Sequence, residues 1–333
     1  MRSTTLIAAA AALGAFAAAA ENEWHDSSPH TVRFVTVAPD VRLEVLDWGG
    51  TGRPIVLLPG LGNTAHVFDD FAPKLTSEYH VYGVTRRGYG ASSAPASGYA
   101  SDRLGDDVLA VLDELKIDRP VLVGHSFGGA ELSSIATRRP ERIAGVVYLD
   151  AAYGYAFDNG KGATFEQMTK VASGVNAPPP GPADIVSFDA VRAWYTRTNG
   201  ITWPEAEFHA LDVTLPDGKP GPPRESPGST AIVAGVQKYS AIRVPALAIF
   251  ATPHDLGPWV AQSAEASKIR ATLEQMESLV TLQATAFEEG VPGARVVRLP
   301  RAHHYVFLSN EADVLRELRS FLAGLRADAA ARR

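Results

Sequence analysis

The sequence predicts an α/β fold built on a mostly parallel, doubly wound sheet. Short runs of consecutive apolar residues, such as 55–58, 121–123 and 146–149, are typical of parallel strands that are covered on both faces. Segments with the apolar spacing of amphipathic helices separate these runs. Strands that alternate with helices imply right-handed crossovers, and sheets of this kind bind ligands outside the carboxyl ends of their strands.

The first twenty residues have the pattern of a secretory signal peptide. Met1 and Arg2 form a charged start, an alanine-rich apolar stretch follows, and Ala18 and Ala20 supply a small-residue cleavage motif. We expect cleavage after Ala20 and a secreted or periplasmic mature chain that begins near Glu21. An uncleaved N-terminal anchor is the alternative, although the apolar stretch is too short for a confident membrane span, and no other segment is long enough to be one.

An antiparallel hairpin is predicted before the parallel strands, because residues 31–37 and 41–48 alternate apolar and polar side chains around Ala38-Pro39-Asp40. The other strands are predicted at 55–58, 81–84, 121–123, 146–149, 247–250 and 295–299. Helices are predicted, from apolar stripes or from their place after a strand, over 104–115 with Ser101 as N-cap, over 129–138 and over 315–325.

The alternation of strands and helices breaks between residues 153 and 242. This stretch contains four prolines within 178–182 and a loop over 216–228, and we interpret it as a cap inserted after the sixth strand. The core would then comprise residues 21–152 and 243–333. The aromatic side chains of the cap either form an apolar lid over a pocket or, as we expect for most of them, build the cap's own small core. They are Phe165, Phe188, Trp194, Tyr195, Trp203 and Phe208.

The composition excludes several classes of function. The chain has 31 lysine and arginine residues against 37 aspartate and glutamate residues, so its net charge of -6 does not indicate a face for nucleic acid or anionic lipid. It has no cysteine, which excludes disulfides and a catalytic thiol. Its nine histidines form no convincing metal-ligand set, and the P-loop lysine is missing. We expect no metal, no cofactor and a small, mostly apolar partner; the oligomeric state stays open.

The segment Gly124-His125-Ser126-Phe127-Gly128 lies between a predicted strand and a predicted helix. A serine at such a turn has a strained backbone that exposes its hydroxyl above the sheet, and the glycines remove Cβ atoms that would clash. Ser126 is therefore the candidate nucleophile. An oxyanion formed there needs two N–H donors. We expect them to be the backbone N–H groups of Phe127 and of Leu61, in the glycine-rich turn 59–63.

A nucleophilic serine needs a base, and the base needs an acid that orients it. The base is expected after the last strand, where His303 and His304 are neighbours, and their adjacency alone does not decide between them. For the acid, Asp255 lies just past the strand 247–250 and is preferred. Asp150, at the end of the preceding strand, is the alternative catalytic acid; otherwise it would be a structural carboxylate that holds loop amides.

Together these motifs resemble those of the α/β-hydrolase fold superfamily, in its capped, esterase-like branch. Residues 124–129 fit the elbow of that family, 58–62 resemble its oxyanion turn with proline in place of the usual histidine, and 87–92 resemble its R-G-x-G-x-S loop. Thr85-Arg86 departs from the pattern, since many relatives carry aspartate before that loop. The resemblance covers nearly all of the mature chain.

The resemblance implies the α/β-hydrolase fold and a triad in the order Ser126, Asp255, His304. It favours His304 over His303, because the family's histidine commonly precedes an aromatic residue, here Tyr305. The implied reaction is cleavage of a small to medium carboxylic ester through an acyl-enzyme. Lactone, thioester or carbon–carbon bond hydrolysis by the same triad is an alternative. A non-catalytic ligand-binding or sensing protein is the alternative of another class.

Overall fold

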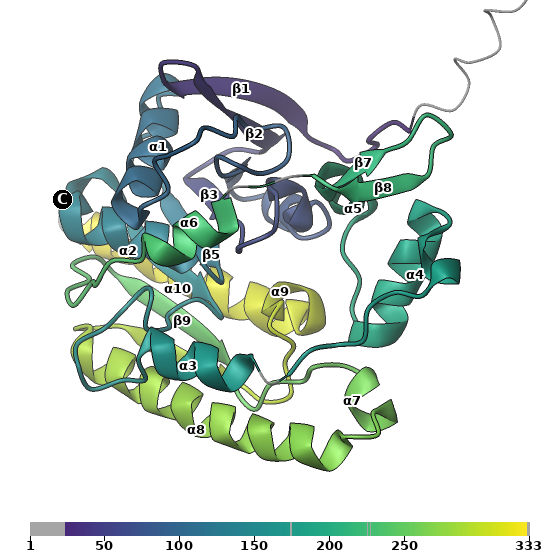
Figure 1. The fold of residues 1–333 in the computed structure, drawn as a ribbon. Helices are drawn as coiled ribbons and strands as arrows, with labels where there is room; N and C mark the ends of the chain where they lie inside the picture. The colour runs from purple at the N-terminus through teal and green to yellow at the C-terminus, as the bar shows by residue number, and fades with distance from the viewer. Residues whose placement is uncertain (1–23, 174, 225, 227, 332–333) are drawn as a thin grey trace, which may run out of the picture.

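The computed structural model describes residues 24–173, 175–224, 226 and 228–331, so the predicted signal peptide lies outside the described residues. Over these residues the chain forms a sheet of eight strands in the order β1-β2-β4-β3-β5-β6-β9-β10, with helices on both faces (Figure 1). The strands are β1 Thr31–Ala38, β2 Val41–Gly49, β3 Pro54–Leu58, β4 His80–Val84, β5 Val121–His125, β6 Gly145–Leu149, β9 Ala246–Ala251 and β10 Arg295–Leu299.

Strand pairing is antiparallel between β1 and β2 and between β2 and β4, and parallel in the rest of this sheet. The predicted N-terminal hairpin and the predicted mostly parallel, doubly wound sheet are thus confirmed. The helices of the core are η1 Ala65–Phe68, η2 Ala72–Leu75, α1 Ser101–Glu114, α2 Gly128–Arg138, η3 Pro140–Arg142, α7 Trp259–Gln262, α8 Ala266–Gly290, α9 Val306–Ser309 and α10 Glu311–Ala331.

Two of these helices differ from the prediction. Ala100, not Ser101, is the N-cap of α1, and the Ser101 hydroxyl donates instead to the Gly235 carbonyl at 3.4 Å. The 25-residue helix α8 was not predicted at all. Only a narrow stripe of α8 is buried, at positions such as Ile269, Val280 and Phe287, so its apolar signal is diluted by polar residues.

The parallel strands are apolar without interruption because they are buried on both faces. In β3, Ile55 and Leu57 pack into one apolar cluster, together with η1, η2 and α10, whereas Val56 and Leu58 pack into the other, together with α1, α2 and α8. Successive side chains of a strand point to opposite faces, so each run supplies both clusters. This sandwich holds the carboxyl ends of β5, β6 and β9 side by side.

In its described residues, the insertion between β6 and β9 contains four α-helices and a small hairpin. Its elements are α3 Phe165–Ala172, η4 Pro182–Ile185, α4 Phe188–Asn199, α5 Glu205–Leu211, β7 Asp212–Thr214, β8 Pro220–Pro223 and α6 Gly228–Ala234. Phe188, Tyr195 and Phe208 are buried against one another, with Trp194 and Trp203 packed on them. These five aromatic residues build a core within the insertion, whereas Phe165 lies elsewhere.

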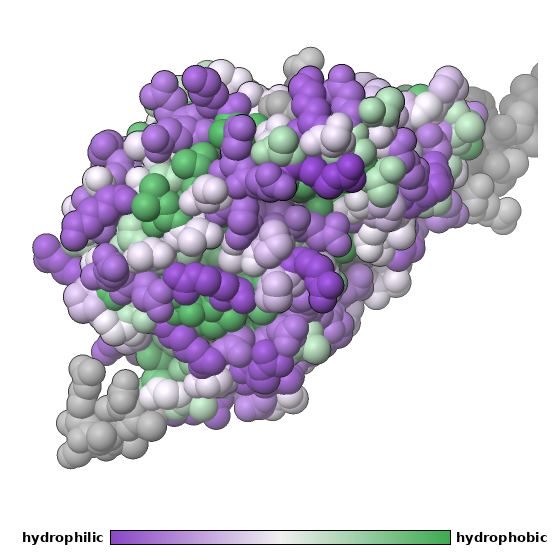
Figure 2. Space-filling model, turned by 90° about the horizontal axis from the view of Figure 1, so that it is seen from below, coloured by the Kyte–Doolittle hydropathy of each residue, from purple (hydrophilic) through white to green (hydrophobic). Residues whose placement is uncertain are grey.

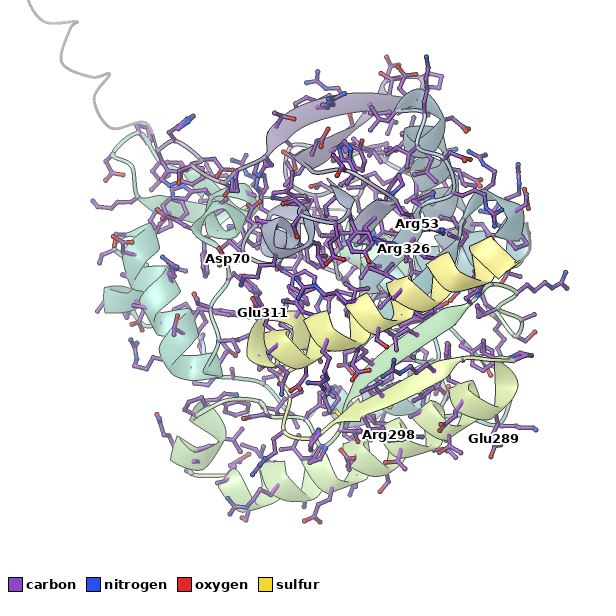
Figure 3. All side chains as sticks on the ribbon, turned by 180° about the vertical axis from the view of Figure 1, so that it is seen from behind. Arg53, Asp70, Glu289, Arg298, Glu311 and Arg326 are labelled. Atoms are coloured by element: carbon purple, nitrogen blue, oxygen red, sulfur yellow. The ribbon has the colours of Figure 1, made fainter. Side chains whose placement is uncertain are left out.

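The outer surface is mostly hydrophilic. Seen from below, polar side chains cover much of the face, with apolar patches between them (Figure 2). From behind, α10 crosses the back of the sheet with Glu311 at its start (Figure 3), where Glu311 forms an ion pair with Lys74. Over the described part of the chain, no helix combines the length and the apolar character that crossing a membrane requires.

Candidate active site

Ser126 lies at the sharp turn between β5 and α2, with a φ of +48° and its N–H donating to the Leu149 carbonyl at 3.3 Å. A positive φ is uncommon for a residue with a side chain. The flanking glycines are required by close backbone approach: a Cβ on Gly128 would lie 2.6 Å from the Leu58 carbonyl oxygen, and one on Gly124 would lie 2.8 Å from the carbonyl carbon of Gly128. The strand, elbow and helix therefore have the arrangement that the sequence predicted.

The carboxylate beside His304 belongs to Asp150. His304 Nδ1 lies 2.6 Å from Asp150 Oδ2, and Asp150 is fully buried at the end of β6. The preference for Asp255 as the acid is corrected accordingly: its Oδ1 instead accepts a 2.8 Å bond from the N–H of Gly257. The cause is the path of the loop after β9, which carries Asp255 to an outer pocket.

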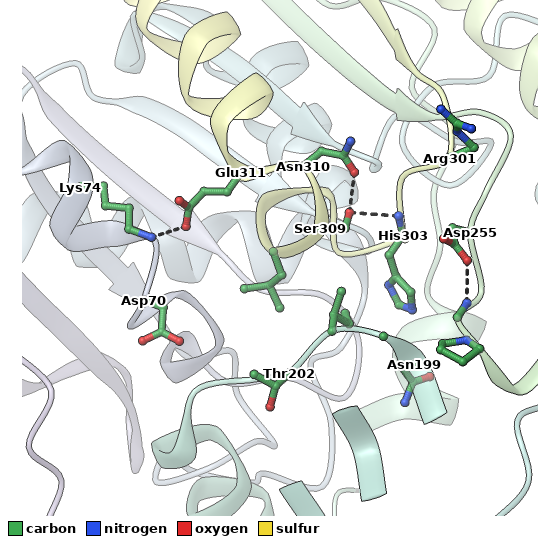
Figure 4. A pocket seen from close by; sticks show the side chains of 15 residues that line it. Asp70, Lys74, Asn199, Thr202, Asp255, Arg301, His303, Ser309, Asn310 and Glu311 are labelled. Atoms are coloured by element: carbon green, nitrogen blue, oxygen red, sulfur yellow. Dashed lines mark hydrogen bonds and ion pairs between the residues drawn. The ribbon is translucent and has the colours of Figure 1, made fainter. Parts of the chain in front are cut away.

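That outer pocket has a volume of about 900 Å³ and is lined by residues that include Asp255, Lys74, Thr202 and His303 (Figure 4). Neither Ser126 nor His304 lines it. The N–H of His303 donates to Ser309 Oγ at 3.0 Å. Burial, together with the neighbouring His304, lowers the pKa of His303 to about 4. His303 is thus a neutral histidine at the rim of this pocket at neutral pH.

Asp150 accepts more hydrogen bonds than the one from His304. His254 Nε2 lies 2.9 Å from the same oxygen, while Oδ1 accepts from the Tyr153 hydroxyl at 2.5 Å and the Ala251 N–H at 2.9 Å. Burial opposes the charged form, but the interactions with His254 and His304 outweigh it and hold the pKa of Asp150 far below its usual range. The carboxylate is therefore ionised at neutral pH and fixed in position.

His254 and Tyr153 were not predicted as site residues. Burial lowers the pKa of His254, but the charge and hydrogen bond of Asp150 raise it by more, so the balance is upward. Burial raises the pKa of Tyr153 well above its usual value, and the adjacent Asp150 adds to this. Both side chains can therefore donate to Asp150. No short motif marks them: Tyr153 lies only three residues after Asp150, whereas His254 meets Asp150 only once β6 and β9 pair.

Leu61 and Phe127 carry the two N–H groups that are expected to bind the oxyanion. Over the described residues, neither the Leu61 N–H nor the Phe127 N–H donates a hydrogen bond. The turn that carries Leu61 is held by Arg86, whose Nη1 and Nη2 donate to the carbonyls of Gly60 and Pro59 at 3.1 and 2.8 Å. Arg86 also forms an ion pair with Glu131 of α2, and both side chains are buried.

Arg86 thus connects the oxyanion turn to the helix that starts at the nucleophile. Burial raises the pKa of Glu131, and the charge of Arg86 counteracts this effect. The Thr85-Arg86 pair, which in sequence stood out as a departure from the family pattern, therefore has a structural role. Its partner Glu131 had no sequence signal, because an ion pair across two elements leaves no periodic pattern.

The insertion contacts the same turn through Glu207 of α5. Glu207 Oε1 accepts from Asn63 Nδ2 at 2.8 Å and from the Thr64 N–H at 3.0 Å, and the Thr64 hydroxyl donates to Oε2. Asn63 Oδ1 in turn accepts from the Tyr305 hydroxyl at 2.8 Å. Burial raises the pKa of Glu207 to about 7, although these hydrogen bonds lower it. Asn63 thereby helps to fix the turn.

Aromatic side chains surround the serine. Phe127 stacks on Tyr155 with ring centroids 4.3 Å apart, and Phe165 of α3 packs edge-on against both rings. Burial raises the pKa of Tyr155 well above its usual value, and the Ser126 side chain counteracts this only in part. The surroundings of Ser126 are thus apolar, with neutral polar groups.

The sheet, the elbow serine and the pair formed by His304 and the buried Asp150 carboxylate define a hydrolase-type site on an α/β scaffold. The sequence pattern of the alpha/beta hydrolase family matches residues 55–317. The chain therefore belongs to the alpha/beta hydrolase family, which confirms the resemblance inferred from its motifs.

Several characterised proteins are similar to parts of the chain. It is 34% identical over 116 residues to 3-oxoadipate enol-lactonase 2 of Acinetobacter baylyi, which covers 34% of this chain and 43% of that protein. It is 32% identical over 146 residues to 2-hydroxymuconate semialdehyde hydrolase of a Pseudomonas species, covering 39% and 51% of the two. The matches thus span only about half or less of these curated relatives.

Solved structures extend the similarity to the whole scaffold. The crystal structure of E-2-(acetamidomethylene)succinate hydrolase superposes with a TM-score of 0.61 and 21% identity, covering 88% of this chain and 99% of that one. At this identity the likeness concerns the fold alone. It agrees with an eight-stranded, mostly parallel sheet that carries helical insertions.

Proposed function

We propose that this protein is a serine hydrolase that cleaves carboxylic esters through an acyl-enzyme on Ser126. The observation that carries the proposal is the 2.6 Å contact between His304 Nδ1 and the buried Asp150 carboxylate. That contact orients the imidazole ring of His304 and leaves its Nε2 as the nitrogen that can accept the proton of Ser126. Catalytic hydrogen bonds to the nucleophile often tighten only when substrate binds.

In the proposed reaction, Ser126 Oγ attacks the ester carbonyl carbon while its proton passes to His304 Nε2. The Asp150 carboxylate stabilises the imidazolium that forms. The N–H groups of Leu61 and Phe127 donate to the oxyanion of the tetrahedral intermediate. The C–O bond then breaks, Nε2 returns the proton to the leaving alcohol, and an acyl-serine ester remains. Water, deprotonated by Nε2, attacks that ester and releases the acid and the free serine.

The surroundings of Ser126 support a small to medium, uncharged acyl or alcohol group. The rings of Phe127, Tyr155 and Phe165 are apolar, and the net charge of -6 disfavours an anionic substrate. Cyclic esters are included in the proposal, because one relative with 34% identity is a lactonase by name. We further propose that the enzyme acts outside the cytoplasm, on the basis of the signal-peptide pattern of residues 1–20.

The proposal is tested by hydrolysis of p-nitrophenyl esters of increasing acyl length, with labelling by a fluorophosphonate probe. The wild type should be active and labelled, whereas Ser126→Ala should lose both properties. The matched control is Ser97→Ala, which removes an exposed hydroxyl and should retain both. A folded wild type that neither hydrolyses these esters or lactones nor takes up the probe would contradict the proposal in favour of ligand binding without turnover.

A further inference from the structure

A second cluster of ionisable side chains lies outside the proposed triad. It consists of Asp26 and His30, which precede β1, His66 in η1, and Asp69, which follows η1. Four ligand-type atoms, one from each residue, lie within 4.8 Å of one another. The side chains of His30, His66 and Asp69 are 3%, 10% and 2% exposed, and that of Asp26 is 23% exposed. Two carboxylates and two imidazoles thus converge in a nearly closed space.

Three distances within the cluster are close to those around a tetrahedral metal ion. Asp26 Oδ2 lies 3.4 Å from both His30 Nε2 and His66 Nδ1, and His66 Nδ1 lies 3.1 Å from Asp69 Oδ2. In a zinc site with bonds of about 2.0 to 2.1 Å, neighbouring ligand atoms are roughly 3.3 to 3.4 Å apart. An ion would therefore fit between these atoms with little movement of the backbone.

The outward-facing atoms of the cluster also have partners of the expected kind. His30 Nδ1 lies 2.9 Å from Asp69 Oδ1, which also accepts from Trp48 Nε1 at 3.1 Å. On the other side of the cluster, His66 Nε2 lies 3.7 Å from Glu44 Oε1. Metal-bound histidines usually donate their second N–H to a carboxylate, which orients the ring. With its proton on Nδ1, His30 would turn the lone pair of Nε2 toward Asp26, which favours a cation between them.

We propose that Asp26, His30, His66 and Asp69 bind one divalent transition-metal ion, for which Zn²⁺ is the best match. The imidazole ligands disfavour Mg²⁺ and Ca²⁺, which take oxygen ligands. Four protein ligands would close the coordination sphere, as in structural zinc sites. The ion would fasten the segment before β1 to η1, which begins directly after the oxyanion turn and is capped by Thr64.

The group around Asp150 fits a metal less well, although it too contains two histidines. Both His304 Nδ1 and His254 Nε2 contact the same oxygen, at 2.6 and 2.9 Å, which are hydrogen-bond distances. The competing explanation for the Asp26 cluster is a single imidazolium ion, that of His66, held by carboxylates. Burial lowers the pKa of His66, but hydrogen bonds to Asp69 and Glu44 raise it to about 10. Under both explanations the site attracts positive charge, but only the first predicts a bound metal ion.

From the sequence we expected no metal, and the proposal revises that expectation. The ligands fall in two pairs, Asp26 with His30 and His66 with Asp69, spaced four and three residues apart. Neither pair combines two cysteines or two histidines, as familiar zinc motifs do, and 35 residues separate the histidines of the two pairs, 30 and 66. Only the packing of the segment before β1 against η1 brings the pairs together.

The test measures zinc in the purified protein after chelator treatment and reloading with Zn²⁺ alone, by elemental analysis and calorimetric titration. One zinc per chain and a raised Tm are expected, and Co²⁺ should give the visible absorption of a tetrahedral site. His30→Ala and Asp69→Asn should weaken binding by more than about 100-fold, since losing an outer partner alone costs 10- to 100-fold. If these variants do not fold, the more exposed Asp26→Asn serves instead.

Two control variants make the result specific. His80→Gln removes a histidine outside the cluster, whose Nε2 lies 2.8 Å from Asp47 Oδ1. This variant should retain the zinc. His304→Gln should retain it as well. A wild type that binds no zinc would overturn the proposal and leave the imidazolium explanation. Zinc that persists in His30→Ala but is lost in His304→Gln would also overturn it, by assigning the ion to the Asp150 group.

Discussion

Asp150 Oδ2 and His304 Nδ1 are 2.6 Å apart, although the carboxylate ends β6 and the histidine follows β10 at the far edge of the sheet. The intervening strand β9 contributes His254, whose Nε2 approaches the same oxygen at 2.9 Å. Asp150 itself has a φ of +48°, a backbone conformation that is uncommon outside glycine. The acid of the proposed triad thus follows β6, one strand earlier in the chain than Asp255, the acid that the sequence favoured, which follows β9.

Replacement of Asp150 separates the two candidate acids. Asp150→Asn removes the charge that stabilises the imidazolium and favours the wrong tautomer of His304, so kcat should fall about 10³- to 10⁴-fold. Asp255→Asn should leave kcat near the wild-type value, because that side chain faces the outer pocket. Steady-state kinetics on the best p-nitrophenyl ester, with circular dichroism as a check on folding, measure both. A large loss in Asp255→Asn alone would restore Asp255 as the acid.

The adjacent histidines should differ just as sharply. His304→Gln should abolish measurable turnover, since the proposed base is lost. His303→Gln should retain most of it, because His303 lies at the outer pocket and its pKa of about 4 leaves it neutral at assay pH. Fluorophosphonate labelling at neutral pH provides a second measurement that does not depend on the choice of ester. Equal losses in the two variants would mean that the loop after β10, not His304 alone, is required.

The fold was predictable because its signals are local. A strand covered on both faces must be apolar at every position, and an elbow must have glycine where backbone approaches backbone, as at Gly128. The feature that determines the catalytic acid, in contrast, is not visible in any short stretch of sequence. Asp150 and Asp255 both follow strands of the sheet, and only the path of the loop after β9 decides which carboxylate meets His304.

The supporting residues were out of reach for the same reason. Arg86 and Glu131, or Glu207 and Asn63, are polar side chains from separate elements that meet only after folding. Arg86 stood out in the sequence only as a departure from the family pattern, and nothing marked Glu131 or Glu207 as buried, because burial of a charge follows no helical or strand period. The aromatic residues of the insertion were visible, but their partners were not: five form their own cluster, while Phe165 alone packs beside the serine.

The ion pair between Arg86 and Glu131 can be tested by comparing single and double variants. Arg86→Met should destabilise the protein by about 3 to 5 kcal/mol, because it leaves a buried carboxylate unpaired. Adding Glu131→Leu should restore most of this stability. It should not restore kcat, since the carbonyls of Pro59 and Gly60 still lack their donor and the oxyanion turn is less well fixed.

Urea unfolding and ester kinetics measure the two effects separately. Arg139→Met is the matched control, because Arg139 pairs with Glu141 at the surface and its loss should change neither quantity appreciably. Recovery of full kcat in the Arg86→Met/Glu131→Leu variant would limit Arg86 to neutralising Glu131. In that case the turn would hold its shape without the two hydrogen bonds from the guanidinium group.

Glu207 predicts a pH dependence of stability. Burial raises its pKa from an ordinary 4.5 to about 7, against the hydrogen bonds from Thr64 and Asn63. The folded state therefore holds this proton more tightly than the unfolded state. Its contribution to stability is complete below about pH 4.5 and is lost as the pH rises through about 7. At about 1.4 kcal/mol per pKa unit, the loss is on the order of 3 kcal/mol.

Glu207→Gln should remove this loss, because the amide stays neutral and can still accept from the Thr64 N–H while donating to the Thr64 hydroxyl. The difference in unfolding free energy between variant and wild type should thus shift in favour of the variant between pH 5 and pH 8, as urea unfolding at both values would measure. Glu205→Gln, on the exposed side of α5, should show no such shift. If the difference in unfolding free energy between Glu207→Gln and wild type is the same at both pH values, Glu207 is already ionised in the folded protein at pH 5. Its hydrogen bonds with Asn63 and Thr64 at the oxyanion turn are then made by a charged carboxylate.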